Sequence, residues 1–246
     1  LLHGLGADAS SWQMQFDALG QNGFRPIAVD LPGFGKSPFS GNRKWTLGYA
    51  AQQVYDLLRT LEIRACVVVG ISMGGTVAQE LVHTFPSLVQ RLVLVNTFAC
   101  LRPEKLGEWW YLLRRFIIAN VRGVEYQARM VAWRLFPGED QGDLRAEMMA
   151  RIVASDRKVY RSAMVELGAF DSRKWLTEIR CPTLVISGEL DTTVPLKAQA
   201  ELARRIPGAL HEVISGARHA VIVDQAIRFN QVLLDFLMTK PEAGAD

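Results

Sequence analysis

The sequence predicts an α/β protein in which a mainly parallel sheet is flanked by helices and interrupted by a helical insertion. Short apolar runs alternate along the chain with segments whose apolar residues recur at helical spacing, and the connections between them are short. From residue 101 to residue 175 this alternation stops, because strand-like apolar runs are missing and helical periodicity takes over. We therefore expect a core in residues 1–98 and 176–246, with residues 99–175 forming a helical lid.

Each element of the core has its own signal in chain order. Leu1-Leu2 has the character of the end of a strand already in progress, so any leading strand or signal peptide is expected upstream of it. Strands are expected at the apolar runs 26–30, 65–69, 91–96, 183–187 and 211–214. Helices are expected at about 10–19, 47–61, 76–85, 196–206 and 224–237, and in the lid at about 103–119, 124–135, 143–155 and 156–169. The expected inward residues of the first two helices are Trp12, Phe16, Leu19, Val54, Leu57, Leu58 and Leu61.

One stretch of this framework carries the pattern G-x-S-x-G, in Gly70-Ile71-Ser72-Met73-Gly74. An apolar run precedes it and a helical stripe follows it, so Ser72 is expected at a sharp turn from strand to helix. A serine hydroxyl becomes a good nucleophile when it is exposed and supplied with a base, and such a turn exposes it. The pattern also arises by chance in glycine-rich loops, so the prediction depends on whether an acid and a base follow.

An acid and a base do follow, each just after a later strand. The run 183–187 leads into Glu189 and Asp191, and the run 211–214 leads into His219. The carboxyl ends of parallel strands meet at one edge of a sheet, where ligands bind in open α/β sheets. We therefore expect Ser72, Asp191 and His219 to lie together, with Glu189 as the alternative acid. His3 is expected to brace its turn, His83 to lie in the last turn of a helix, where a cation suits the helix dipole, and His211 to be exposed at the start of a strand.

These residues and motifs resemble those of the α/β-hydrolase family, in which nucleophile, acid and base follow in this order. The resemblance covers nearly the whole chain outside the lid and rests on HGLG at 3–6, DLPGFGKS at 30–37, GISMGG at 70–75, GELD at 188–191 and GARH at 216–219. It implies the α/β-hydrolase fold, with Ser72 attacking an acyl carbon, His219 moving the proton and Asp191 orienting the imidazole. It also implies that the backbone N–H groups of Leu5 and Met73 form the oxyanion hole.

The resemblance implies a hydrolase and leaves its substrate open. A serine at the turn excludes the haloalkane dehalogenase and epoxide hydrolase branches, which place an aspartate there. The main expectation is cleavage of small carboxylic esters through an acyl-enzyme. The alternatives are a lactonase similar to the 3-oxoadipate enol-lactonases, a perhydrolase (non-haem haloperoxidase), a carbon–carbon bond hydrolase and a small-molecule receptor of the same fold. Gly6-Ala7-Asp8 stands where carbon–carbon bond hydrolases usually carry Gly-Pro-Gly, which counts against that branch.

Composition narrows the partners and the location. The net charge is +3 and no basic run is comparable to a nucleic-acid patch, so nucleic acid is not an expected partner. GFGKS at 33–37 lacks the spacing of a phosphate loop, and Cys66, Cys100 and Cys181 lack the spacing of a metal site or a disulfide framework. No apolar run reaches transmembrane length. We expect a cytoplasmic protein that acts on a small ester or lactone without a cofactor or metal, in an oligomeric state that the sequence leaves open.

Overall fold

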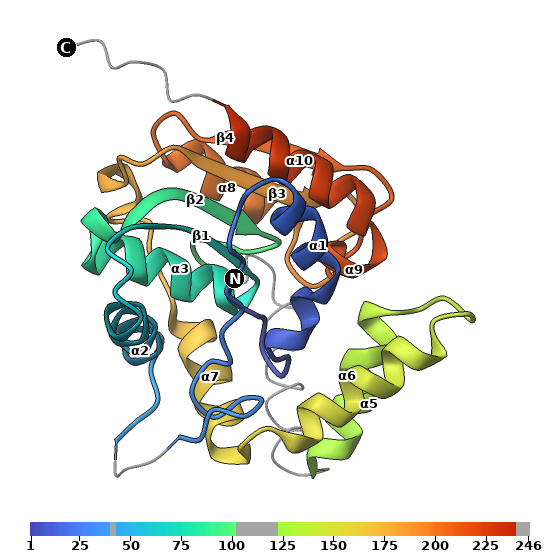
Figure 1. Ribbon diagram of the computed structural model, residues 1–246. Coiled ribbons are helices and arrows are strands. Elements are labelled where there is room, and N and C mark those ends of the chain that lie inside the picture. Colours follow the sequence, from blue (N-terminus) through green and yellow to red (C-terminus); the bar gives the residue numbers. More distant parts are fainter. Residues whose placement is uncertain (40–42, 102–122, 240–246) are drawn as a thin grey trace, which may run out of the picture.

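A parallel sheet forms the centre of the computed structural model, which describes residues 1–39, 43–101 and 123–239 (Figure 1). Its strands stand side by side in chain order, and each neighbouring pair is parallel, as the sequence predicts. They are β1 (Cys66–Ile71), β2 (Val89–Val95), β3 (Thr183–Gly188) and β4 (Leu210–Ile214). The start of the chain adds to the other side of β1, since Leu2 bridges both Gly70 and Val29. The strand expected at 26–30 is wrong, because that segment forms this single bridge.

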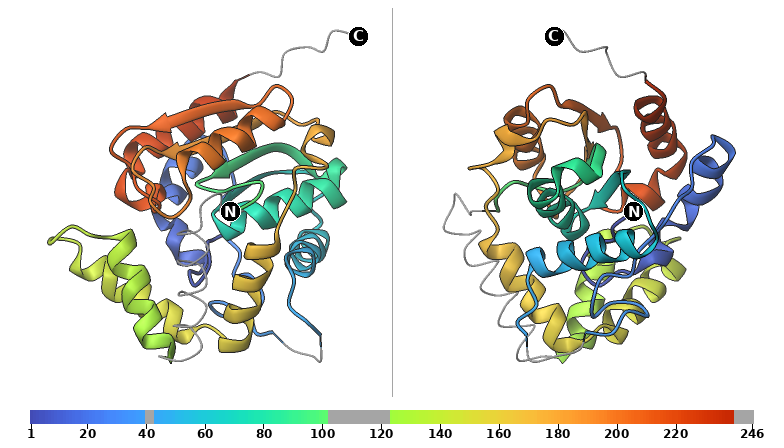
Figure 2. Two further views of the ribbon diagram at one scale, coloured as in Figure 1. Left: turned by 180° about the vertical axis from the view of Figure 1, so that it is seen from behind. Right: turned by 60° about the vertical axis from the view of Figure 1, so that its left-hand side comes forward.

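Helices cover both faces of the sheet, because successive strand side chains point into two separate apolar clusters. On β1, Val69 and Ile71 belong to one cluster and Val68 to the other. The first face carries α1 (Gln13–Gln21), α9 (Val221–Asp224) and α10 (Ala226–Met238), and the second carries α2 (Leu47–Thr60), α3 (Met73–Thr84) and α8 (Leu196–Arg205) (Figure 2). Among the helices of the described residues, none combines the length and the apolar character needed to cross a membrane.

The first helix buries a different set of residues from the one expected. Residues Ala9–Trp12 form a 3₁₀ turn, and α1 begins only after it. A 3₁₀ turn advances 120° per residue and an α-helix 100°, so the stripe that starts at Trp12 does not continue at Phe16. Phe16 is 38% exposed and its expected inward position is wrong, whereas Gln15 is buried. The Gln15 amide nitrogen donates to the Ile222 carbonyl at 2.9 Å, beside α9.

The second helix packs through smaller residues than expected. Leu57 and Leu61 are 37% and 40% exposed, so their inward assignment is wrong. Ala50 and Ala51 are buried instead, in line with Val54 and Leu58. Helix α2 packs on α3, and its buried residues do not include the two leucines.

The described part of the chain between β2 and β3 is helical, close to the predicted bounds. It forms α5 (Gly123–Leu135), α6 (Gly142–Ala154) and α7 (Arg157–Ala169), and the helix expected at 103–119 lies outside the described residues. Asp156 caps α7 by accepting from the N–H groups of Lys158 and Val159 at 2.8 and 3.1 Å. Helices α5 and α6 pack on each other, and α7 packs on α2. Figures 1 and 2 show all three helices gathered beside the layered core.

Candidate active site

Ser72 occupies the sharp turn between β1 and α3. Its backbone has φ 53° and ψ −116°, a conformation that residues other than glycine seldom adopt. Hydrogen bonds hold the turn on both sides, since the Ser72 N–H donates to the Val95 carbonyl at 2.9 Å and the Thr97 hydroxyl donates to the Ser72 carbonyl at 2.8 Å. The turn is therefore fixed by the neighbouring strand β2, and the Ser72 side chain lines a pocket.

Two glycines make this turn possible. A Cβ on Gly70 would lie 2.2 Å from the Gly74 carbonyl oxygen, and a Cβ on Gly74 would lie 2.1 Å from the Leu2 carbonyl oxygen. Both distances are far inside van der Waals contact with backbone atoms, so no larger residue fits without moving the chain. The start of α3 consequently packs directly against the first segment of the chain. A Cβ on Gly4 would lie 3.5 Å from the Ser72 Cβ, which shows how close the HGLG turn comes to the serine.

Asp191 and His219 meet at the carboxyl ends of β3 and β4. The Nδ1 atom of His219 lies 2.8 Å from Asp191 Oδ2, and the Asp191 side chain is fully buried. Asp191 also accepts from the N–H groups of Thr193 and Val194 at 2.7 and 3.0 Å and from the Gln199 amide at 3.2 Å. These donors offset the burial of the carboxylate and fix its orientation. Since Nδ1 faces the carboxylate, Nε2 is the nitrogen of His219 that can take a proton.

Glu189, the alternative acid, is engaged elsewhere. Its carboxylate accepts from the Gly216 N–H at 2.9 Å and from the Ser215 hydroxyl at 2.7 Å. The Gly216 and Ser215 hydrogen bonds lower the pKa of Glu189, in that order of size. The structure therefore pairs His219 with Asp191 and leaves Glu189 at the exposed side of the same loop.

Asn96 joins the two loops that carry Asp191 and His219, although the sequence pattern did not single it out. Its amide nitrogen donates to the carbonyls of Arg218 and His219 at 2.9 and 2.8 Å, and its Oδ1 accepts from the Gly188 N–H at 2.7 Å. The side chain is fully buried and the backbone has φ 43°. The sequence signal for Asn96 was a polar residue at the carboxyl end of the apolar run RLVLVN. The loops that carry Asp191 and His219 begin at the carboxyl ends of other apolar runs.

His3 braces the turn that contains Leu5. The Leu31 N–H donates to His3 Nε2 at 3.0 Å, so Nδ1 carries the proton and faces the Gly4 carbonyl at 2.8 Å. The ring is fully buried, and burial lowers its pKa more than the Gly4 hydrogen bond raises it. A neutral ring is therefore built into this turn, as its expected structural role requires.

Leu5 and Met73 are the residues expected to form the oxyanion hole, and Met73 directly follows Ser72 in the chain. Leu5 lines the pocket, and Met73 is fully buried at the first position of α3. Within the described residues, no hydrogen bond to a protein acceptor is found for either of their N–H groups. The first N–H groups of a helix also carry partial positive charge, which favours an anion near Met73.

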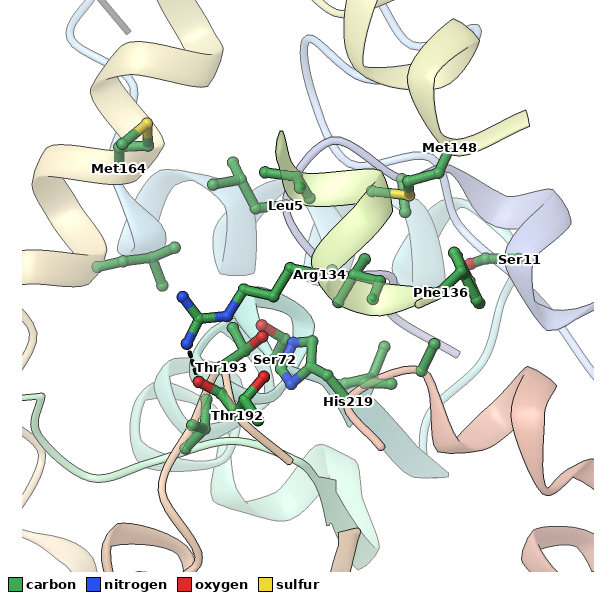
Figure 3. A pocket seen from close by; sticks show the side chains of 18 of the residues that line it. Leu5, Ser11, Ser72, Arg134, Phe136, Met148, Met164, Thr192, Thr193 and His219 are labelled. Carbon is green, nitrogen blue, oxygen red and sulfur yellow. Dashed lines mark hydrogen bonds between the residues drawn. The ribbon is translucent and has the colours of Figure 1, made fainter. Parts of the chain in front are cut away.

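The pocket has a volume of about 1740 Å³ and lies between the core and α5–α7. Ser72, His219 and Leu5 line it, while Asp191 and Met73 do not. Figure 3 shows Ser72 and His219 at the same end of the pocket, with Leu5, Phe136 and Met148 on its walls. The walls are mainly apolar with a few polar groups, which is typical of sites for small organic molecules. In the part of the chain that the structure describes, no group of three or more His, Cys, Asp or Glu side chains could hold a metal ion.

Comparison with known proteins identifies the family of this chain. A family model described as the alpha/beta hydrolase fold matches residues 1–226. The chain belongs to this family, and it is a hydrolase.

Individual relatives cover almost the whole chain. The "Putative carbamate hydrolase RutD" of Serratia proteamaculans is 31% identical over 248 residues, which span 98% of this chain and 90% of the relative. A pimeloyl-[acyl-carrier protein] methyl ester esterase of Aeromonas hydrophila is 28% identical and covers 96% of this chain and 94% of its own length. Among solved structures, the enol-lactonase of Burkholderia xenovorans LB400 matches with a TM-score of 0.87 and 28% identity, over 97% of this chain and 90% of its own.

Proposed function

We propose that this hydrolase cleaves carboxylic ester bonds of small substrates through an acyl-enzyme formed on Ser72. The observation that supports it most is the 2.8 Å contact between His219 Nδ1 and the buried carboxylate of Asp191, at the end of the pocket that Ser72 lines. A nucleophile, a base and an acid that orients the base are the parts that acyl transfer requires.

The first half-reaction transfers the acyl group to the enzyme. Ser72 Oγ forms a bond to the carbonyl carbon while His219 Nε2 accepts the hydroxyl proton, and the carbonyl electrons move onto oxygen. The N–H groups of Leu5 and Met73 stabilise this oxyanion. The bond to the alcohol oxygen then breaks, and His219 returns the proton to that oxygen. Asp191 stabilises the imidazolium and keeps the ring oriented throughout.

The second half-reaction follows the same proton route with water. The water oxygen bonds to the acyl carbon as His219 accepts its proton, and the oxyanion forms again between the same two N–H groups. The bond to Ser72 Oγ then breaks, and Oγ recovers the proton from His219. The carboxylic acid is released and the free enzyme is restored.

The names of the relatives support a carbonyl compound as the substrate. They specify a methyl ester, a lactone and a carbamate, and each of these contains a carbonyl carbon bonded to a leaving oxygen or nitrogen. Lactone hydrolysis is our second candidate, on the likeness to the enol-lactonase over 97% of this chain. In a lactone the leaving alcohol stays joined to the acyl group. Ser72, His219 and Asp191 would have the same roles as in ester hydrolysis.

We also propose that residues 99–175 form the lid of this site. Residues of α5, α6 and α7 line the pocket together with Ser72 and His219. Helix α7 is tied to the core, since the Asp156 N–H donates to the Gly33 carbonyl at 3.0 Å and Lys44 forms a 2.8 Å ion pair with Glu166. Side chains of these helices would then select the acyl and alcohol groups.

Hydrolysis of p-nitrophenyl esters, from acetate to octanoate, tests the proposed function. Turnover by the wild type should fall by about 10⁴-fold or more in Ser72→Ala, since removal of a serine nucleophile has that order of effect. Ser11→Ala is the control, because Ser11 also lines the pocket but lies away from the strand–helix turn. If ester and lactone substrates are untouched by the folded wild type, the proposal is wrong, and tight ligand binding without turnover would favour a receptor.

A further inference from the structure

A buried glutamine belongs to the wall of the pocket. Gln127 is 6% exposed and stands on α5, whose other buried residues are Val124, Ala128, Ala132 and Leu135. Residues three, four and seven positions apart share one face of a helix, so Gln127 lies within an otherwise apolar stripe. Burial of an amide among apolar side chains costs free energy unless its polar groups are hydrogen-bonded.

The hydrogen-bond partner of Gln127 is a weak one. Its Nε2 donates to the Sδ atom of Met164 on α7 at 3.1 Å, and no other hydrogen bond of this side chain is found within the described residues. A thioether sulfur is a weak acceptor, and an amide nitrogen carries two N–H donors. One N–H group and the Oε1 atom of Gln127 are therefore left for a group that occupies the pocket, which Gln127 lines.

The other glutamines that are buried in the described residues brace the fold. The Nε2 atom of each of them donates to two oxygen acceptors: Gln15 to the Ile222 carbonyl and Asn230 Oδ1, Gln79 to the Gly75 and Phe98 carbonyls, and Gln199 to Asp191 Oδ2 and the Val194 carbonyl. None of these three lines the pocket. Gln127 thus differs from them both in its acceptor and in its place beside the pocket.

The groups that Gln127 leaves unused fit a neutral amide. A carboxamide offers one N–H donor and one carbonyl acceptor side by side, so it can bond to Oε1 and to the remaining N–H group of Gln127 at once. A carboxylate has no donor for Oε1, and an alkyl group satisfies neither atom. Hydrogen bonds to a carboxamide would offset the cost of burying the Gln127 side chain.

We propose that Gln127 is a specificity-determining residue that binds a carboxamide of the substrate, so that the preferred substrates are esters with an amide some distance from the cleaved bond. This inference rests on the proposed function for the identity of that bond. Figure 3 shows Met164, the partner of Gln127, apart from the end of the pocket that holds Ser72 and His219. The span between the two places sets the preferred length of the chain that joins amide and ester.

The test compares amide esters with apolar esters of the same shape. Methyl succinamate, glutaramate and adipamate are each paired with the methyl ester in which an isopropyl group replaces the carboxamide. A second set places the amide in the alcohol, as acetates of glycolamide and its longer ω-hydroxy homologues, with the same isopropyl partners. The wild type should show a higher kcat/KM for at least one amide ester than for its partner.

Gln127→Met keeps the length of the side chain and removes its hydrogen-bonding groups. It should reduce the preference for the amide ester by about 10-fold, mainly through KM, and should not lower the melting temperature, because methionine suits the apolar stripe. Gln13→Met is the matched control, since Gln13 also lines the pocket but is exposed at the start of α1, and it should keep the preference. An equal preference in wild type and Gln127→Met would overturn the inference.

A binding experiment separates this inference from the proposed function. The same esters are titrated into Ser72→Ala and into Ser72→Ala with Gln127→Met. Tighter binding of an amide ester that is lost with Gln127→Met supports the amide site even if the wild type cleaves no ester, in which case the proposed function alone fails. If esters are cleaved through Ser72 while amide and isopropyl partners bind equally well, the amide site is excluded and the proposed function stands.

Discussion

The imidazole of His219 and the carboxylate of Asp191 are joined by a 2.8 Å hydrogen bond although the residues are 28 positions apart in the chain. The carboxylate is fully buried and the imidazole 11% exposed, so this pair has one face toward the protein and one toward the pocket. Substitution of Asp191 and substitution of Glu189 should therefore have different effects on kcat.

Asp191→Asn should lower kcat by about 10³- to 10⁴-fold and change KM little, because the amide no longer stabilises the imidazolium or its tautomer. Steady-state kinetics on the best p-nitrophenyl ester measures this, with circular dichroism to confirm folding. Glu189→Gln is the matched control, since Glu189 binds Ser215 and Gly216 instead of the histidine. A large loss in Glu189→Gln and a small one in Asp191→Asn would reverse the assignment of the acid.

Asn96→Gly should lower kcat more than it raises KM, because Asn96 holds the Asp191 and His219 loops together. Glycine accepts the φ of 43° at this position without strain, so the variant isolates the loss of the amide. The buried Gly188 N–H and two carbonyls lose their partner, and the free energy of unfolding should fall by about 2–4 kcal/mol. Denaturant unfolding and kinetics are measured together. Asn22→Gly, which removes an exposed amide bonded within α1, should leave kcat unchanged.

The neutral, buried His3 makes stability depend on pH in the acid range. Since burial lowers its folded pKa below 6.5, the unfolded chain binds a proton first as the pH falls, and this proton favours unfolding. The contribution is fully present above pH 6.5 and is lost as the pH falls below it, by at most about 1.4 kcal/mol per pH unit. Denaturant unfolding of wild type and His3→Asn from pH 7.5 to 5 measures the slope. Equal slopes for both proteins would show that His3 does not supply this dependence.

Gly74→Ala should destabilise the protein by about 3 kcal/mol or more, because the new Cβ would meet the Leu2 carbonyl oxygen at 2.1 Å. Gly20→Ala, in α1, is the opposite case. Nothing lies within 4 Å of its new Cβ, so it should stabilise α1 by about 0.5–1 kcal/mol. Thermal melts of both variants test the pair. A tolerated alanine at position 74 would mean that the turn at Ser72 is looser than its contacts indicate.

Much of the fold was predictable because it depends on local patterns. The apolar runs predicted β1 to β4, and helical spacing predicted α5, α6 and α7 to within one residue of their observed bounds. Inward and outward positions were less predictable, since Phe16 and Leu57 satisfy the helical spacing yet lie outside the packed face. The buried face of a helix depends on the 3₁₀ turn before α1 and on how α2 packs against α3, and local spacing encodes neither.

The sequence by itself determined the candidate nucleophile and the chain order of acid and base. A strand, a glycine-bounded serine and a helix define a turn through short-range sterics, and the ends of parallel strands must share one edge. Only the tertiary structure placed the Asp191 carboxylate against His219, placed Asn96 between two loops and brought Arg134 from α5 to the Thr192 carbonyl. These contacts join residues 28 to 123 positions apart, and no local spacing encodes how packed layers direct such side chains toward one another.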